Sequence, residues 1–229
     1  MRTIGLIGGM SWVSTAEYYR LTNELVGERL GGLHSAAILL ESVDFAEIED
    51  LKIAGRWDAV GARLAGAGAR LEAAGADLVV LCTNTMHHVA PTIEAALSVP
   101  FVHIADTTAQ AVAAAGLSRV GLLGTAFTME QPFYVDRVAG HGIEVLVPPD
   151  DDRARISAII YDELCRGVVS AGSKAFYLAA VERLVEEGAE GVILGCTEIE
   201  LLIDQDDLRI PTFATTSLHV MAAVDLALA

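Results

Sequence analysis

The chain has 229 residues, of which 53% are apolar, and it carries a formal net charge of −16 at pH 7. A chain of this size and apolar content has room for one large domain or for two small α/β lobes. The negative charge argues against non-specific binding to nucleic acid, because phosphates require a basic surface. It also means that an anionic substrate needs compensating cations close to it.

The sequence gives no sign of a membrane protein or a secreted one. No apolar run reaches the roughly 18 residues of a membrane span, and the first residues are typical of a strand rather than of a secretory leader. The three cysteines, Cys82, Cys165 and Cys196, stand in unlike contexts and do not form a disulfide framework. We therefore expect a cytoplasmic protein without membrane or nucleic-acid partners.

The first half of the chain alternates short apolar runs with helical stretches. A strand that ends in a glycine turn is expected over 3–10, followed by a helix that Ser11 caps and that ends at glycines 31 and 32. Further strands are expected over 36–40, 78–81 and 102–104. Further helices are expected over 46–53, 57–74, 84–97 and 107–115, with Gly75 at the C′ position of the second, Pro91 interrupting the third and Asp106 capping the fourth.

The second half repeats this order. Strands are expected over 118–125, 143–147, 192–194 and 210–213, and helices over 129–140, 152–166, 174–187 and from Thr216 onward. Residues 75–85 align without gaps with residues 188–198, which sets Thr83 opposite Cys196. Strands alternating with helices predict two pseudo-symmetric Rossmann-like (flavodoxin-like) α/β lobes, each with a parallel sheet flanked by helices. The expected lobes are residues 1–104 plus 215–229, and residues 105–214, with an active site in the cleft between them.

Cys196 ends an apolar strand and precedes polar residues that can open a helix. Open α/β sheets bind ligands at this edge, and a helix N-terminus lowers a thiol pKa; the alternative is a cysteine that packs as a small apolar side chain. A ligand held between two such strand ends can lose a proton on one face and regain one on the other. The reaction that needs this arrangement is inversion of an acidic C–H centre.

The sequence predicts no cofactor. Glycines 5, 8 and 9 do not match the dinucleotide fingerprint, no P-loop lysine follows them, and no lysine for pyridoxal phosphate is evident. These glycines permit either a close approach to a small ligand or simple strand-to-helix packing. His87 and His88 have no carboxylate partner at metal-binding spacing, so no metal site is expected.

Three stretches resemble the aspartate/glutamate racemase family of PLP-independent amino-acid racemases: residues 3–12, Thr83-Asn84-Thr85-Met86-His87, and Gly195-Cys196-Thr197-Glu198. The resemblance covers nearly the whole chain. It implies a cofactor-free racemase with two catalytic bases, usually a homodimer, that acts on aspartate, glutamate or a similar small amino acid. One departure matters, because the family's first catalytic cysteine matches Thr83 here and not Cys82.

The resemblance assigns catalysis to Cys196 as a strong base and to Thr83 as a weak partner, which predicts a site that favours one enantiomer. Strand alternation directs Cys82 away from the face that Thr83 uses, and Cys165 is expected to be structural. The expected substrate-binding residues are Met10, Ser11, Lys52, Asn84, Thr85, Thr125 and Thr197. Three further residues, His87, Glu198 and Arg166, are expected to support the site: His87 by buttressing the first loop, Glu198 by orienting the Cys196 thiol or taking its proton, and Arg166 as an alternative cation to Lys52.

Two other functions remain open at this point. Arylmalonate decarboxylases and maleate isomerases share the two-lobed fold, and one reactive cysteine is sufficient for their chemistry. An amino-acid-binding protein that lost turnover together with the first cysteine is the non-enzymatic alternative.

Overall fold

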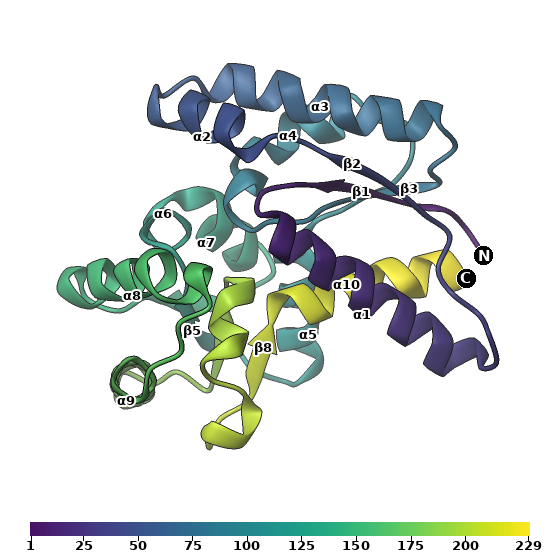
Figure 1. Ribbon diagram of the computed structural model, residues 1–229. Coiled ribbons are helices and arrows are strands. Elements are labelled where there is room, and N and C mark those ends of the chain that lie inside the picture. Colours follow the sequence, from purple (N-terminus) through teal and green to yellow (C-terminus); the bar gives the residue numbers. More distant parts are fainter. The chain divides into compact units, whose positions relative to one another are not determined.

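The computed structural model describes all 229 residues and divides into two compact units. The first unit contains residues Met1–Ile104 and His219–Ala229, and the second contains Ala105–Leu218. Each unit has a four-stranded parallel sheet, with the order β2-β1-β3-β4 in the first and β6-β5-β7-β8 in the second (Figure 1). The same strand order in both units confirms the predicted repeat and the two-lobed parallel α/β fold.

The first unit is built from the following elements: β1 (Ile4–Gly8), α1 (Trp12–Leu30), β2 (Ile38–Ser42), α2 (Phe45–Ile53), α3 (Trp57–Ala73), β3 (Leu78–Leu81), the 3-10 helix η1 (Thr85–Val89), α4 (Ala90–Glu94) and β4 (Phe101–Val102). Helix α5 (Ile104–Ala114) starts at its boundary. The end of α10 (Thr215–Leu228) returns to this unit. In Figure 1, α2 and α3 lie on one face of the sheet and α1 and α10 on the other.

The central strands β1 and β3 are buried along their whole length, as expected for a sheet covered on both faces. Their side chains alternate between two separate cores. Ile7 and Leu81 pack in the core beneath α2 and α3. Leu6 and Cys82 pack in the other core, with residues of α1 and α10. Cys82 therefore fills the interior of the first unit, as the alternation predicts.

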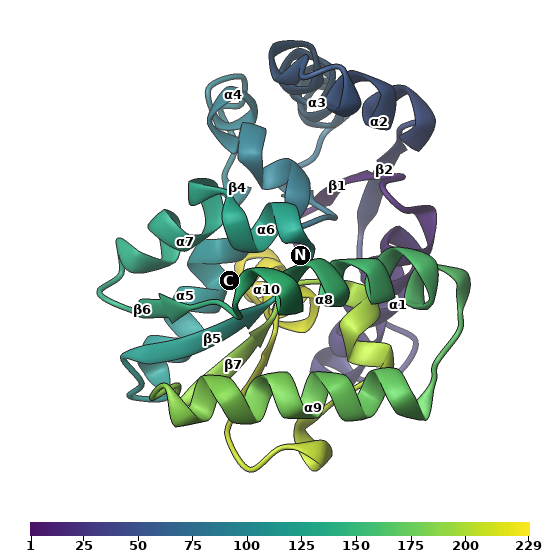
Figure 2. The same ribbon diagram turned by 90° about the vertical axis from the view of Figure 1, so that its left-hand side faces the viewer.

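The second unit is built from β5 (Arg119–Leu123), α6 (Ala126–Glu130), α7 (Pro132–Ala139), β6 (Glu144–Leu146), α8 (Asp150–Asp162), the 3-10 helix η2 (Leu164–Arg166), α9 (Ala171–Glu186), β7 (Gly191–Leu194), the 3-10 helices η3 (Thr197–Leu201) and η4 (Gln205–Asp207), and β8 (Thr212–Ala214). Figure 2 shows β5 and β7 side by side, with α9 running along the sheet. No helix of the chain combines the length and hydropathy that crossing a bilayer requires.

The strand register brings two loops together at the carboxyl edge of each sheet. Ile7 of β1 is paired with Leu81 of β3, so the turns that follow β1 and β3 leave the first sheet at the same level. Leu123 of β5 is paired with Leu194 of β7, so the turns that follow β5 and β7 also leave the second sheet at the same level. Ligand sites of open parallel sheets lie at this edge.

Four expected elements differ in the structure, mainly at their ends. The helix expected over 129–140 is two helices, because Pro132 starts α7, where a missing N–H costs nothing. The region 84–97 forms η1 and then α4, which has Pro91 in its first turn. The helix expected over 152–166 ends at Asp162 and gives way to η2.

The fourth difference concerns Asp106. Helix α5 already starts at Ile104, a residue expected to end a strand, so Asp106 lies inside the first turn and is not the N-cap. Its carboxylate instead accepts two hydrogen bonds from the Arg137 guanidinium, at 2.8 and 2.6 Å. The ion pair ties α5 to α7 within the second unit.

Candidate active site

The turn after β1 is held by the start of α1. Ser11 caps α1 and accepts a hydrogen bond from the Ser14 amide at 3.3 Å, as predicted. The Thr15 hydroxyl accepts from the Gly9 amide and donates to the Ser11 carbonyl, both at 2.8 Å. Met10 is buried among the residues of the α2 and α3 core. The side chain of Met10 thus packs inward, while Ser11 is partly exposed at the edge of the sheet.

Gly8 and Gly9 in this turn have close neighbours that leave no space for a side chain. A Cβ at Gly8 would lie 2.3 Å from a Thr15 methyl, and one at Gly9 would lie 2.2 Å from the Val43 carbonyl oxygen. Gly9 also has a φ of 97°, which other residues rarely adopt. Strand-to-helix packing therefore accounts for Gly8, and close packing against the loop after β2 accounts for Gly9.

Thr83 follows β3 and lies partly buried at the same edge. The His87 Nδ1 lies 2.7 Å from the Thr83 carbonyl oxygen, and the His87 Nε2 accepts from the Ile104 amide at 3.3 Å. A neutral imidazole with its proton on Nδ1 satisfies both contacts. Asn84 is buried and Thr85 is partly buried at the start of η1. His87 thus contacts both the Thr83 peptide and the start of α5.

Cys82 is fully buried, and burial raises the pKa of its thiol far above the ordinary value. A thiol in that environment is inert as a base at neutral pH. Thr83, its neighbour in the chain, is the side chain of this pair that reaches the partly exposed edge.

Cys196 follows β7 in the second unit, and Gly195 before it donates its amide to the Leu123 carbonyl at 2.7 Å. The Cys196 Sγ donates to the Glu198 Oε2 at 2.9 Å. Burial first, and then the negative charge of Glu198, raise the pKa of Cys196 well above its usual value. The expectation that a helix N-terminus lowers the pKa of Cys196 is therefore wrong. The helix that follows, η3, is a 3-10 helix of only five residues, and loss of hydration of the thiolate outweighs its dipole.

Two further side chains share the surroundings of Cys196. Tyr177 is fully buried and donates to the Ile156 carbonyl at 3.1 Å; its pKa is raised by burial and by the charges of Cys196 and Glu163. Cys165 lies on η2, where partial desolvation and then the charge of Glu198 raise its pKa to about 11. Burial and the negative charge of Glu198 therefore keep the Cys196 thiol protonated.

The two threonines predicted in this unit are both held by hydrogen bonds. Thr125 is buried and caps α6, where its hydroxyl accepts from the Thr128 amide at 3.3 Å. The Thr197 hydroxyl lies 3.2 Å from the hydroxyl of Thr216, at the start of α10. Each threonine follows one of the two central strands of the second sheet.

The two predicted cations differ in their surroundings. The Lys52 ammonium on α2 lies 2.6 Å from the Glu49 carboxylate, and its side chain is only 17% exposed. The Arg166 side chain on η2 is 71% exposed and lies 3.7 Å from Asp162. The charge of Lys52 is thus largely compensated, whereas Arg166 is the cation more accessible to a ligand.

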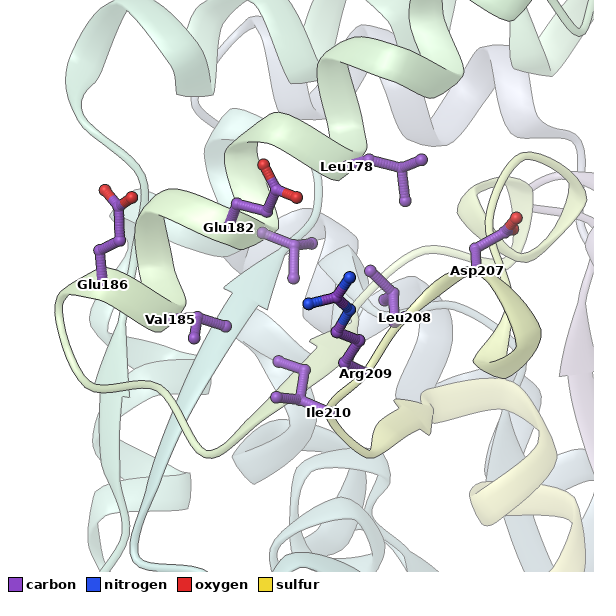
Figure 3. Close-up of a pocket in the computed structure, with 9 residues that line it drawn as sticks. Leu178, Glu182, Val185, Glu186, Asp207, Leu208, Arg209 and Ile210 are labelled. Atoms are coloured by element: carbon purple, nitrogen blue, oxygen red, sulfur yellow. The ribbon is translucent and has the colours of Figure 1, made fainter.

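A surface groove of about 370 Å³ lies elsewhere in the second unit, between α9 and the segment 205–210 (Figure 3). Apolar side chains of both segments form it, and Glu182 and Arg209 extend over it. None of the residues predicted for the active site lines this groove.

The model of the family described as Asp/Glu/Hydantoin racemase matches residues 7–223. The chain belongs to this family. The racemase family thus covers both units, including the strand ends that carry Thr83 and Cys196.

Solved structures agree with this assignment. A candidate Asp/Glu racemase from Yersinia pestis is 50% identical over the full length of both chains, with a TM-score of 0.97. An aspartate racemase homologue from Pyrococcus horikoshii OT3 is 33% identical over the full length of both, with a TM-score of 0.91. An unliganded arylmalonate decarboxylase is 17% identical over 99% of this chain and 93% of its own, with a TM-score of 0.55, which shows the fold alone.

Membership in the racemase family supports an isomerase of the Asp/Glu racemase type that acts on small amino acids. Tyr177, Glu163 and His219 are not marked by any sequence motif. Tyr177 and His219 are fully buried, and Glu163 is partly buried. The one signal for His219 is an imidazole in a helix whose residues are mostly apolar.

Proposed function

We propose that this racemase-family protein inverts the α-carbon of aspartate, glutamate or a similar small amino acid without a cofactor. The observation that carries the proposal is the hydrogen bond from Cys196 to Glu198 at the carboxyl end of β7. The Cys196 thiol is protonated at rest, and this hydrogen bond places a carboxylate where it can accept the thiol proton. Family membership and the repeat, in which Thr83 takes the equivalent place after β3, support the same function.

In this mechanism, Glu198 takes the thiol proton when the substrate binds, and the Cys196 thiolate then removes the proton from the α-carbon. The electron pair of the broken C–H bond moves onto the substrate carboxylate. The electron pair then returns to the carbon, and the Thr83 hydroxyl, acting with a water molecule, donates a proton to the opposite face. The proton held by Glu198 passes to water, and water replaces the proton that the Thr83 side has lost. Reaction in the other direction uses the same groups in the opposite roles.

The two halves of the reaction are unequal in this proposal. A thiol loses its proton near pH 8.5 in water, whereas an aliphatic hydroxyl has no ionisation near neutral pH. We therefore expect rapid Cα–H exchange from the enantiomer that faces Cys196 and slow net inversion. The family resemblance suggests that this is the L-enantiomer.

Substrate binding is proposed to use the polar groups at the starts of the short helices. Asn84 and Thr85 stand at the start of η1, and Thr197 at that of η3, where free backbone N–H groups favour a carboxylate. Arg166 is the cation proposed to offset the charge of the substrate, because its side chain is much more exposed than that of Lys52 and its ion pair is longer. The remaining candidates are Met10, Ser11 and Thr125, from the turns after β1 and β5.

The test is incubation in D₂O with each enantiomer of a panel of amino acids, with the Cα–H signal followed by NMR and the products by chiral chromatography. Cys196→Ser is expected to abolish exchange. Thr83→Cys is expected to increase net inversion because it restores a second thiol. A folded Thr83→Cys variant with no gain contradicts the role given to position 83.

A single-cysteine decarboxylase or isomerase is the second candidate, favoured by the presence of one strong candidate base and by the shared fold of arylmalonate decarboxylase. The same incubation with arylmalonates and maleate distinguishes it. Activity on those compounds alone supports this alternative, and binding of an amino acid without exchange supports an amino-acid-binding protein.

We further propose that the protein is a homodimer and works in the cytoplasm, where its three free cysteines stay reduced. Size-exclusion chromatography with light scattering tests the first point. A mass near 24 kDa, that of one chain, contradicts it.

A further inference from the structure

Three imidazoles pack together in the interior of the first unit. The ring centroid of His87 lies 4.6 Å from that of His103 and 5.7 Å from that of His219. The three side chains are 1%, 5% and 0% exposed, in the same order. We call His87, His103 and His219 the histidine cluster.

His219 joins three elements of this unit. From α10, its Nε2 donates to the Val102 carbonyl of β4 at 2.7 Å, and its Nδ1 accepts from the Tyr18 hydroxyl of α1 at 2.9 Å. Both ring nitrogens are therefore in use, one as donor and one as acceptor, which requires the neutral imidazole. The ring of His219 is fixed in position and orientation by these two bonds.

The cluster reaches Thr83 through His87. His87 donates from Nδ1 to the Thr83 carbonyl and accepts at Nε2 from the Ile104 amide. Its ring lies against the rings of His103 and His219, so the position of His87 depends on where those two rings are held. The peptide that starts at Thr83 is thus supported by a continuous path of contacts from α10 and α1.

We propose that His219 is a positioning residue for the Thr83 loop, acting through the ring of His87. This inference rests on the proposed two-base function, because it assigns His219 to the half of the reaction that residue 83 serves. The half served by Cys196 depends on a different sheet and is not expected to respond. A small displacement of a reacting group is sufficient for a large loss of rate.

The experiment uses Thr83→Cys as the parent, because its first-unit thiol makes both half-reactions fast enough to compare. His219→Gln is added, which retains a donor for the Val102 carbonyl and removes the ring that lies against His87. We expect exchange of the enantiomer served by residue 83 to fall roughly tenfold or more, and exchange of the enantiomer served by Cys196 to stay within about twofold. Thr22→Val is the control; it removes a buried hydroxyl of α1 that bonds the Tyr18 carbonyl, and it is expected to change neither rate.

A second readout does not depend on catalysis. The imidazole ¹⁵N signals of His87 and the amide signal of residue 83 are compared with and without His219→Gln by NMR. We expect the chemical shifts of His87 and of residue 83 to change in His219→Gln. We expect them to stay unchanged in Thr22→Val. Where His219→Gln does not fold, Tyr18→Phe removes one of the two bonds that fix His219, and we expect it to act in the same direction with a smaller effect.

The outcomes separate the two proposals. Equal losses of both exchange rates, or no loss in a folded variant, overturn the positioning role and leave the two-base function intact. No exchange of either enantiomer in the parent overturns the two-base function, while shifted His87 and residue 83 signals still support the coupling. Unshifted signals overturn the coupling in every case.

Discussion

The buried neutral imidazole of His219 predicts a specific dependence of stability on pH. Burial lowers the pKa of His219 to about 4, from an ordinary value of 6.5. Because the unfolded chain binds this proton more readily, the stability that His219 contributes is complete above pH 6.5. It is lost as the pH falls towards 4. The loss amounts to roughly 1.4 kcal/mol per pH unit inside this window, and to roughly 2.5 kcal/mol between pH 7.5 and 4.5.

The assay compares the wild-type protein with His219→Phe, which keeps an aromatic ring and cannot take up a proton. The free energy of unfolding is measured by urea denaturation at several pH values between 7.5 and 4.5. Titration of the carboxylates is shared by both proteins and cancels in the difference. We expect the advantage of the wild type to shrink by roughly 2.5 kcal/mol as the pH falls. A difference that stays constant within about 0.5 kcal/mol refutes the neutral, buried state of His219.

The remaining predictions concern the thiols and the first turn. Glu198→Gln removes a charge that raises the pKa of Cys196, so iodoacetamide should alkylate that thiol faster at pH 8 while Cα–H exchange slows; slower alkylation contradicts the assigned charge effect. Gly9→Ala should destabilise the protein by more than about 3 kcal/mol in urea denaturation. Gly167→Ala, at a left-handed position with open space around it, should cost only about 1 kcal/mol. Cys82→Ala should cost about 1 kcal/mol and leave exchange unchanged, and a loss of exchange contradicts its role as a packing residue.

The exact ends of the helices were the least predictable part of the fold. Asp106 is of a residue type that is common at N-caps. Helix α5 nevertheless starts two residues earlier, because Ile104 is buried and its amide donates to His87. Pro132 lies within the single helix expected over 129–140, but it starts α7, because a proline starts a helix more easily than it continues one. Such ends depend on long-range contacts that no local pattern contains.

The pKa of Cys196 likewise depends on contacts that form only in the folded protein. The sequence identifies a thiol at a strand end and a glutamate two residues later. A helix N-terminus lowers a thiol pKa and burial raises it, and the balance depends on how much water reaches the sulfur. In the folded unit burial and the Glu198 carboxylate prevail. The position of the thiol can therefore be predicted from sequence motifs, whereas the direction of its pKa shift depends on the burial of the sulfur.

The fold class, the repeat, the family and the separation of Cys82 from Thr83 can all be predicted from the amino-acid sequence. These features follow from local patterns: apolar runs that alternate with helical stretches, short motifs, and the period of two in a strand. The protonation of Cys196, the pairing of Lys52 with Glu49 and the histidine cluster behind Thr83 are visible only in the folded protein. Those features depend on burial and on contacts between residues far apart in the chain, such as Tyr18 and His219, which meet only when the strands and helices are assembled.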